Sequence, residues 1–304
     1  MKNKIEYKGV QYTVEDNRLV HMYILNDMLV GNKRNVDIVI PHIFPTGEEI
    51  TIIDQRLILT GAGNLSDKEV NVFIFDGIVT IEPNAFEFAT IHTVRWPSTC
   101  PVIPDKCFKC SYIVKICNIS HVESVGEGAF LDSNIRKIRW PSKCERIPEC
   151  CFCGSRLEKI YGIEGVKQIE ERAFEATNIN KFEWPEQCST IPARCFKNSK
   201  LLSILGIEEV EEVSASAFAN TLLQTLKWPS KCTDIPSKCF SGSEIRTISN
   251  LQNIQHIGER CFECADNLEI DLSEAAIISI ELNAFAGLKR EKVKLPFYFT
   301  DEEV

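Results

Sequence analysis

The stretch from Trp140 to Glu183, WPSKCERIPECCFCGSRLEKIYGIEGVKQIEERAFEATNINKFE, contains the pattern that decides the fold. It is one period of a 44-residue repeat, because the four tryptophans of the chain lie 44 residues apart. They are Trp96, Trp140, Trp184 and Trp228. Each tryptophan is followed by proline and then, at the fourth position after it, by cysteine. These cysteines are Cys100, Cys144, Cys188 and Cys232.

A shorter period lies inside the longer one. A phenylalanine preceded by Ala or Cys recurs every 22 residues, and one last copy follows after 23. The series is Phe86, Phe108, Phe130, Phe152, Phe174, Phe196, Phe218, Phe240, Phe262 and Phe285. A fixed period of about 20–29 residues is typical of a leucine-rich-repeat solenoid, in which each repeat forms one turn of a superhelix.

Apolar residues also form columns when the chain is aligned on this phenylalanine. They recur five, eight and seventeen positions after it, which gives the pattern L-x-x-I-x-W and predicts a strand with alternate residues pointing inward. The fold class that follows is α/β or mainly β. We predict a right-handed leucine-rich-repeat solenoid with one continuous parallel sheet, about ten coils of 22 residues, capped at both ends.

Three segments follow from these columns. Residues 1–73 lie before the 22-residue phenylalanine series and contain short strand-like runs. We predict that they form a β-rich N-terminal cap, since an open solenoid end needs an atypical unit to cover it. Residues 74–288 form the repeats. Residues 289–304 form a C-terminal cap that ends in an acidic tail.

The 44-residue period divides the repeats into two kinds. Two positions after the column that lies eight residues after each phenylalanine, tryptophan alternates with a small or polar residue. These residues are Asn118, Gly162, Gly206 and Asn250. We interpret this alternation as large and small side chains filling one core without overpacking.

Charge and hydropathy exclude several classes of protein. The net charge of −9 argues against general nucleic-acid binding. No stretch approaches 18 apolar residues and no N-terminal apolar region is present, so neither a transmembrane segment nor a secretory signal is predicted. As given, the chain is expected to be cytoplasmic.

The fourteen cysteines permit several interpretations. Most occupy columns in which Ala or Val alternates with them, so we expect free buried thiols. Equivalent cysteines two coils apart would be ~10 Å apart, which exceeds the ~7 Å limit for a disulfide. Cys239 and Cys261 are one coil apart and could form a bridge under oxidation. Three C-x-x-C pairs allow a zinc site as an alternative, but they are not in register.

No catalytic motif is present. The five histidines form no metal-binding helix motif, and no nucleophile motif or phosphate loop occurs. The sequence therefore predicts no enzyme, no cofactor and no metal.

The strand residues expected to point outward, seven and nine positions after each phenylalanine, carry a stripe of positive charge. The candidate binding residues are Arg95, Lys115, Lys137, Arg139, Lys159, Tyr161, Lys181 and Lys227. One interpretation is a solvated lysine face. The other is a concave patch for a protein with an acidic surface or for a glycan, since stacked repeats present one extended surface.

The repeats resemble a known family. The segments VGEGAF (Val125 to Phe130) and IGERCFEC (Ile257 to Cys264) are similar to the BspA-like, or Treponema-type, leucine-rich repeats, over about 210 residues. The resemblance implies protein–protein interaction, often adhesion to host cells or matrix, and with it a location at the cell surface or outside the cell. It transfers no functional residues.

Taken together, these patterns favour a non-catalytic protein-interaction scaffold that binds through its sheet face. The alternative is a structural repeat protein that self-associates without a discrete ligand.

Overall fold

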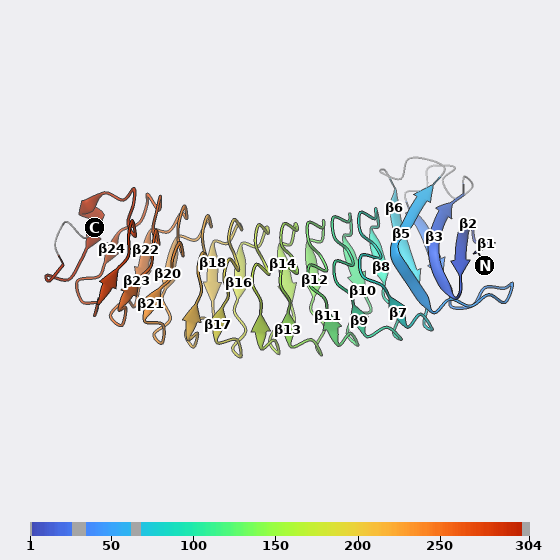
Figure 1. Ribbon diagram of the computed structural model, residues 1–304, viewed down its shortest axis with the longest axis horizontal. Coiled ribbons are helices and arrows are strands. Elements are labelled where there is room, and N and C mark those ends of the chain that lie inside the picture. Colours follow the sequence, from blue (N-terminus) through green and yellow to red (C-terminus); the bar gives the residue numbers. More distant parts are fainter. Residues whose placement is uncertain (1, 26–34, 62–67, 300–304) are drawn as a thin grey trace. The chain divides into compact units, whose positions relative to one another are not determined.

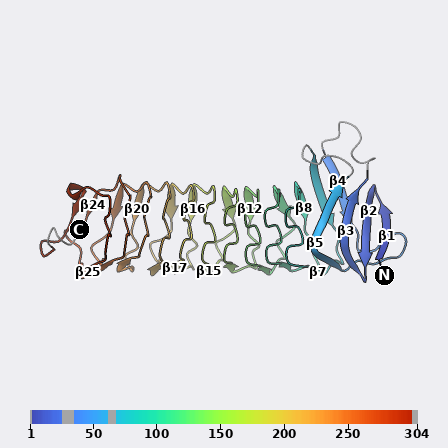
Figure 2. The same ribbon diagram turned by 45° about the horizontal axis from the view of Figure 1, so that its top comes forward.

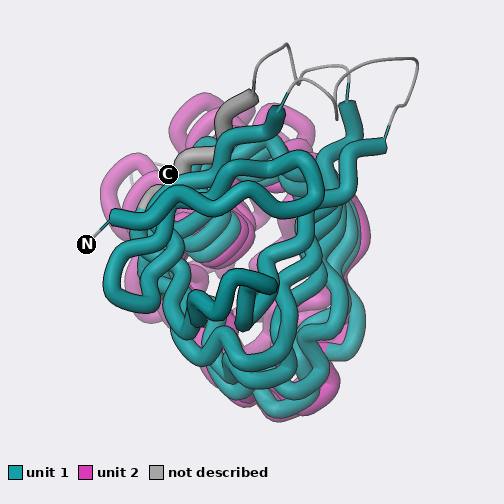
Figure 3. The backbone as a smooth tube through the Cα atoms, turned by 90° about the vertical axis from the view of Figure 1, so that its right-hand side faces the viewer, with its two compact units in different colours: residues 1–144, 155–162 teal, residues 145–154, 163–304 magenta. Residues whose placement is uncertain are grey.

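The computed structural model describes residues 2–25, 35–61 and 68–299. The acidic tail expected at 301–304 lies outside these residues. The chain packs as two compact units, residues 1–144 with 155–162 and residues 145–154 with 163–304 (Figure 3).

The N-terminal strands of the first unit form two sheets. Strands β1 and β2 pair antiparallel, as do β2 and β3, whereas β3 pairs parallel with β5 and β5 with β7. Strands β4, β6, β8 and β10 form a wholly parallel sheet (Figure 2). The bounds are β1 Lys2–Tyr7, β2 Val10–Glu15, β3 Arg18–Ile24, β4 Asn35–Ile40, β5 Ile52–Gly61, β6 Glu69–Ile74 and β7 Thr80–Ile81.

Each repeat contributes a three-residue strand and a two-residue strand, and in each unit these form two separate rows (Figure 1). The three-residue strands are β8 Thr93–Arg95, β10 Lys115–Cys117, β12 Lys137–Arg139, β14 Lys159–Tyr161, β16 Lys181–Glu183, β18 Ser203–Leu205, β20 Thr225–Lys227 and β22 Thr247–Ser249. The two-residue strands are β9 Val102–Ile103, β11 Ser124–Val125, β13 Arg146–Ile147, β15 Gln168–Ile169, β17 Thr190–Ile191, β19 Glu212–Val213, β21 Asp234–Ile235, β23 His256–Ile257 and β25 Ser279–Ile280.

The last repeats are irregular. Strand β24 (Ile270–Asp271) pairs parallel with β26 (Val293–Lys294), and the 3-10 helix η1 (Arg290–Lys292) precedes β26. This short helix is the only one in the described residues. The prediction of a mainly β, parallel solenoid with about ten turns of about 22 residues is confirmed. The boundaries of the three predicted segments remain a prediction.

The predicted continuous sheet proves to be a series of short ladders. We call a coil that carries Trp-Pro a Trp coil, and a coil that carries Gly or Asn at the tryptophan position a Gly/Asn coil. Each Trp coil pairs with the Gly/Asn coil that follows it, as in β8–β10, β12–β14, β16–β18 and β20–β22. Within the described residues, no ladder joins β10 to β12 or β18 to β20, although these strands are neighbours. Pairing of the three-residue strands from β8 to β22, taken within each unit, therefore has the same 44-residue period as the tryptophans.

The phenylalanine column is a stack of parallel rings in each unit. In the first unit the rings of Phe86 and Phe108 have centroids 5.4 Å apart at 9°, and Phe108 and Phe130 follow at 5.5 Å and 8°. In the second unit the stack continues without a break from Phe152 to Phe285, with centroids 5.4–6.1 Å apart. This offset-stacked geometry adds to the burial of each ring, so the column is the core of every coil.

The Trp-Pro-x-x-Cys motif has a hydrogen-bonding explanation. The indole N–H of Trp140 donates to the carbonyl oxygen of Cys144 at 3.0 Å, and the thiol of Cys144 donates to the carbonyl oxygen of Val122 at 3.4 Å, one coil back. In the second unit Trp184, Cys188 and Val166 repeat the arrangement at 2.8 and 3.3 Å. Burial raises the pKa of both thiols to about 11, so these cysteines are packing residues.

The small residues opposite tryptophan are not in the core, so the large–small packing interpretation is wrong at this position. Gly162 and Asn250 are half-buried, and Asn118 and Gly206 are exposed. All four have a left-handed backbone, with φ between 62° and 78°, which favours Gly and Asn. Asn118 donates to the carbonyl oxygen of Trp96 at 2.8 Å, and a Cβ added to Gly206 would lie 2.9 Å from the carbonyl oxygen of Trp184.

Candidate functional site

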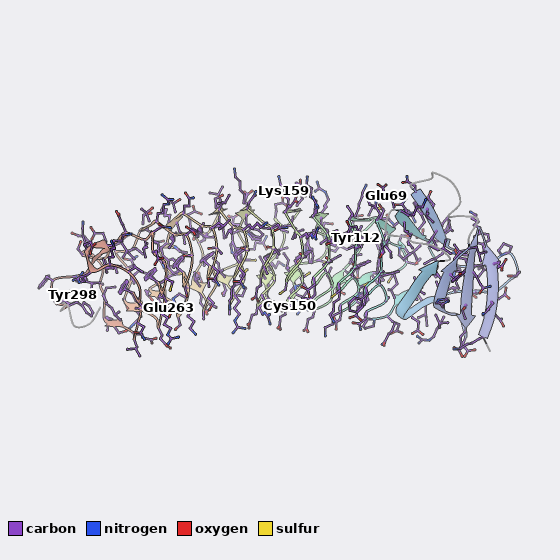
Figure 4. All side chains as sticks on the ribbon, turned by 90° about the horizontal axis from the view of Figure 1, so that it is seen from above. Glu69, Tyr112, Cys150, Lys159, Glu263 and Tyr298 are labelled. Atoms are coloured by element: carbon purple, nitrogen blue, oxygen red, sulfur yellow. The ribbon has the colours of Figure 1, made fainter. Side chains whose placement is uncertain are left out.

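The three-residue strands of the first unit orient the candidate binding residues. In β8, β10 and β12 the middle residue is buried, and the residues on either side of it point away from the core. Lys115, Lys137 and Lys159 occupy the first strand position and are exposed. Figure 4 shows Lys159 projecting from the same side of this unit as Glu69.

Strands β12 and β14 bring four of the candidates together. Their parallel register places Lys137 beside Lys159 and Arg139 beside Tyr161. The Nζ atom of Lys159 lies 4.8 Å from the centroid of the Tyr161 ring, and the Cζ atom of Arg139 lies 5.9 Å from it. Tyr161 is therefore an exposed aromatic ring between two cations, in the range of favourable cation–π contact.

The lysines of this patch have no carboxylate partner among the described residues. Among the residues that the structure describes, Lys115, Lys137 and Lys159 form no ion pair or hydrogen bond through their side chains. Elsewhere in the unit, by contrast, Lys143 pairs with Glu123 at 2.7 Å. Two unit charges ~5 Å apart in water repel by ~0.8 kcal/mol, so side-by-side lysines cost some stability that no neighbouring carboxylate offsets.

Acidic and polar residues border the patch. On the same sheet, β4 carries Asp37, which accepts a hydrogen bond from the Asn71 amide of β6 at 2.9 Å. Glu158, just before β14, pairs with Arg136 at 3.6 Å. Within the first unit the candidate cations therefore lie on β8, β10, β12 and β14, next to these acidic residues.

Arg95 interacts electrostatically with the carboxylate of Asp76. It is half-buried on β8, and its charge contributes to a lowered pKa of Asp76. The larger cause of that lowered pKa is the hydrogen bond that the backbone N–H of Ser98 donates to the carboxylate, at 2.7 Å.

The other two predicted residues belong to the second unit. Lys181 is exposed on β16 beside Ser203, and Lys227 is exposed on β20 beside Ser249. The third strand positions there include Glu183 and Leu205, which is 67% exposed. Within this unit the outward face is mixed in charge. We define the basic face as Arg95, Lys115, Lys137, Arg139, Lys159 and Tyr161.

Two features were missed in the sequence. A column of Ser or Thr three positions after the phenylalanine is buried. Four of its hydroxyls donate to the phenylalanine carbonyl, as Ser111 does to Phe108 at 2.7 Å and Thr177 to Phe174 at 2.9 Å. Its 22-residue period is visible in the sequence and could have been used. The second feature is Tyr112, which is 55% exposed just before β10 and belongs to no recurring column of the repeat.

No cluster of metal ligands emerges. Within the described ranges, no group of three or more His, Cys, Asp or Glu side chains could hold a metal ion. None of the helical structure in the described part of the chain is long and apolar enough to span a bilayer. None of the fourteen cysteines, all of which lie in the described residues, forms a disulfide, and those that are not fully buried are Cys110, Cys117, Cys150 and Cys264.

Short parallel strands, one stacked phenylalanine per coil and a 22-residue turn define a leucine-rich-repeat type of β-solenoid. The model of the BspA type leucine rich repeat region matches residues 66–158, 123–246 and 190–301, in six copies. The chain belongs to this family.

Solved structures show the same fold. A leucine rich cell surface protein from Faecalibacterium prausnitzii A2-165 is 19% identical, with a TM-score of 0.56, over 94% of this chain and 86% of that one. The pneumococcal vaccine antigen PcpA is 16% identical, with a TM-score of 0.51, over 90% of this chain and 77% of that one. No curated protein matches the sequence. Members of such repeat families generally serve as scaffolds for protein interaction.

Proposed function

We propose that this protein is a non-catalytic scaffold that binds a macromolecular partner through the basic face. The observation that carries the proposal is the group around Tyr161, where Arg139 and Lys159 flank an exposed ring and Lys137 lies beside Lys159 without a carboxylate partner. An exposed aromatic ring with adjacent cations suits a partner that offers carboxylates and an apolar surface. The partner class is an acidic protein surface, with an acidic glycan as the alternative.

The compartment is part of the proposal. Fourteen cysteines without a disulfide among them favour a reducing environment such as the cytoplasm. The Faecalibacterium structure is that of a cell surface protein, and this supports the surface or the exterior of the cell as the alternative, with adhesion as the corresponding role.

The experiment compares two triple variants of equal charge change. One carries Lys115→Glu, Lys137→Glu and Lys159→Glu on the basic face. The control carries Lys106→Glu, Lys200→Glu and Lys238→Glu, which are exposed lysines outside it. Binding is measured by calorimetry against a poly-glutamate peptide and a sulfated oligosaccharide. We expect about a tenfold or greater loss for the first variant alone, and affinity that falls with salt. Equal losses in both variants would show that net charge, and not the basic face, governs binding.

One observation favours self-association as a second function. The backbone N–H groups of Asn283, Phe285 and Gly287 have no acceptor among the described residues, whereas the N–H groups of Arg260, Phe262 and Cys264 donate to the following coil. Leu282 and Ile278 beside them are 75% and 66% exposed. An unpaired backbone edge with apolar neighbours favours assembly. Light scattering from a dilution series tests this, since a constant mass at all concentrations would argue against it.

A further inference from the structure

The turns that hold the phenylalanine column bring two side chains together on the surface. In the second unit, Arg172 lies two residues before Phe174 and Glu175 one residue after it, and the Nε atom of Arg172 is 2.6 Å from a carboxylate oxygen of Glu175. Arg260 and Glu263 occupy the same two positions around Phe262, 4.0 Å apart. We call these two places the paired turn positions, because their side chains face each other.

Around Phe152 the paired turn positions are occupied by Cys150 and Cys153. Cys150 has a left-handed backbone with φ of 53°, as Arg172 does with 59°. The backbone N–H of Cys153 donates to the carbonyl oxygen of Cys150 at 3.1 Å, which closes a turn of four residues with one thiol at each end. The ends of such a four-residue turn are within ~7 Å of each other, which is inside the range that a disulfide can span.

Access differs between the two thiols. Cys150 is half-buried and lies on the same side of the second unit as Glu263 (Figure 4), whereas Cys153 is 9% exposed. A reagent therefore reaches Cys150 first, with Cys153 in position to attack it afterwards.

The other two C-x-x-C pairs are one residue out of step. Cys107 and Cys261 lie directly before the phenylalanine and are fully buried, whereas Cys110 is half-exposed and Cys264 is exposed two residues after it. Their members therefore do not occupy the paired turn positions. They have the same spacing in sequence, so they are a natural control within one chain.

Arg172 of the next coil supplies positive charge. Burial is the largest effect on the pKa of Cys150 and raises it above its usual value; Arg172 lowers it, and the carboxylates of Glu149 and Glu175 raise it. The same guanidinium also interacts with Cys153. A neighbouring cation stabilises the thiolate, which is the reactive form in exchange with disulfides.

We propose that Cys150 and Cys153 form a redox-active dithiol that exchanges with low-molecular-weight disulfides and closes to a disulfide within one turn. The Cys150 thiolate attacks one sulfur of the disulfide, a mixed disulfide forms, and one thiolate leaves. The Cys153 thiolate then attacks the Sγ atom of Cys150, the intramolecular bond forms, and the second thiolate leaves. The two protein thiols are oxidised and give their protons to solvent. The small disulfide is reduced to two thiols.

The test treats the native chain with glutathione disulfide, blocks remaining thiols and analyses tryptic peptides by mass spectrometry. A Cys151→Ala background removes the third thiol from the peptide 147–156, and it is compatible with the fold because Ala173 occupies the equivalent buried position. We expect that peptide to lose about 2 Da, and Cys150→Ser or Cys153→Ser to abolish the loss. The peptides 107–109 and 110–115, which contain Cys107 and Cys110, should not become joined by a disulfide, and the peptide 261–289, with Cys261 and Cys264, should keep its mass.

Three results would overturn the proposal. They are no reaction at Cys150, a mixed disulfide at Cys150 that never closes, and closure of all three pairs to the same extent. A second measurement separates chemistry from structure. Arg172→Gln should slow the first step several-fold at neutral pH and Arg172→Lys should restore it, whereas a merely structural role of Arg172 would give no such rescue.

Discussion

The indole nitrogen of Trp140 donates a hydrogen bond to the carbonyl oxygen of Cys144, four residues later, at 3.0 Å. Trp228 is as deeply buried, yet its indole nitrogen has no partner among the described residues. The two tryptophans occupy the same place in their coils and differ in this one bond.

Trp140→Phe should therefore destabilise the protein more than Trp228→Phe. Both substitutions remove part of a buried ring, but only the first leaves a buried carbonyl without its donor, which costs about 1–3 kcal/mol. The free energy of unfolding from denaturant titration is the measurement. Equal losses in the two variants would mean that the indole bond contributes nothing.

The phenylalanine stack predicts a strong dependence on position. Phe108 is completely buried between Phe86 and Phe130, so Phe108→Ala should cost about 3–5 kcal/mol. Phe88→Ala is the control, since Phe88 is 69% exposed in a neighbouring turn, and we expect a change within about 0.5 kcal/mol. Comparable losses would contradict the assignment of the stack as the core.

Gly206 should accept asparagine better than alanine. Its φ of 78° is left-handed and a Cβ would meet the Trp184 carbonyl, so Gly206→Ala should lose about 1–2 kcal/mol. Gly206→Asn should lose less, because Asn250 has the same conformation and donates to the Trp228 carbonyl at 2.7 Å. Gly165→Ala, with no atom within 4 Å of the added Cβ, is the control. Thermal unfolding of the three variants gives the order.

Asp271 gives the C-terminal repeats an acid sensitivity. Hydrogen bonds from Ser273 and Lys294 lower its pKa from 3.8 to about 2. Because the folded-state pKa is lowered, the stabilisation is present above pH 3.8 and is lost as the pH falls toward 2.

Carboxyl NMR shifts should place the titration of Asp271 near its lowered value in the native protein. In a Ser273→Ala variant the pKa should rise, since the first of these donors is gone. An unchanged midpoint would show that the Ser273 hydroxyl does not hold this carboxylate.

Much of the fold follows from the sequence, for a physical reason. A buried side chain such as Phe108 has to recur at every coil, and an outward lysine such as Lys137 has to lie between two inward columns, so periodicity alone places both. Periodicity could not show that Asn118 and Gly162 have a left-handed backbone, because that conformation depends on the carbonyl of the preceding coil.

The candidate site, too, could be predicted from the sequence only in part. The sequence placed Lys137, Arg139, Lys159 and Tyr161 on one face, since that needs only alternation along a strand. It could not show that the lysines lack carboxylate partners. The one-residue shift between Cys150 and Cys153 and the pair Cys107 and Cys110 is visible in the sequence. What the sequence could not show is that side chains at the first pair of positions face each other, as Arg172 and Glu175 do.

The pairing of each Trp coil with the Gly/Asn coil after it constrains how such a gene can change in length. Duplication or loss of 44 residues leaves every tryptophan carbonyl opposite the asparagine or glycine that fits it. Removal of a single 22-residue coil would place two coils of the same kind next to each other and leave one such carbonyl without its Asn or Gly. Natural and engineered variants of this protein should therefore grow and shrink in steps of two coils.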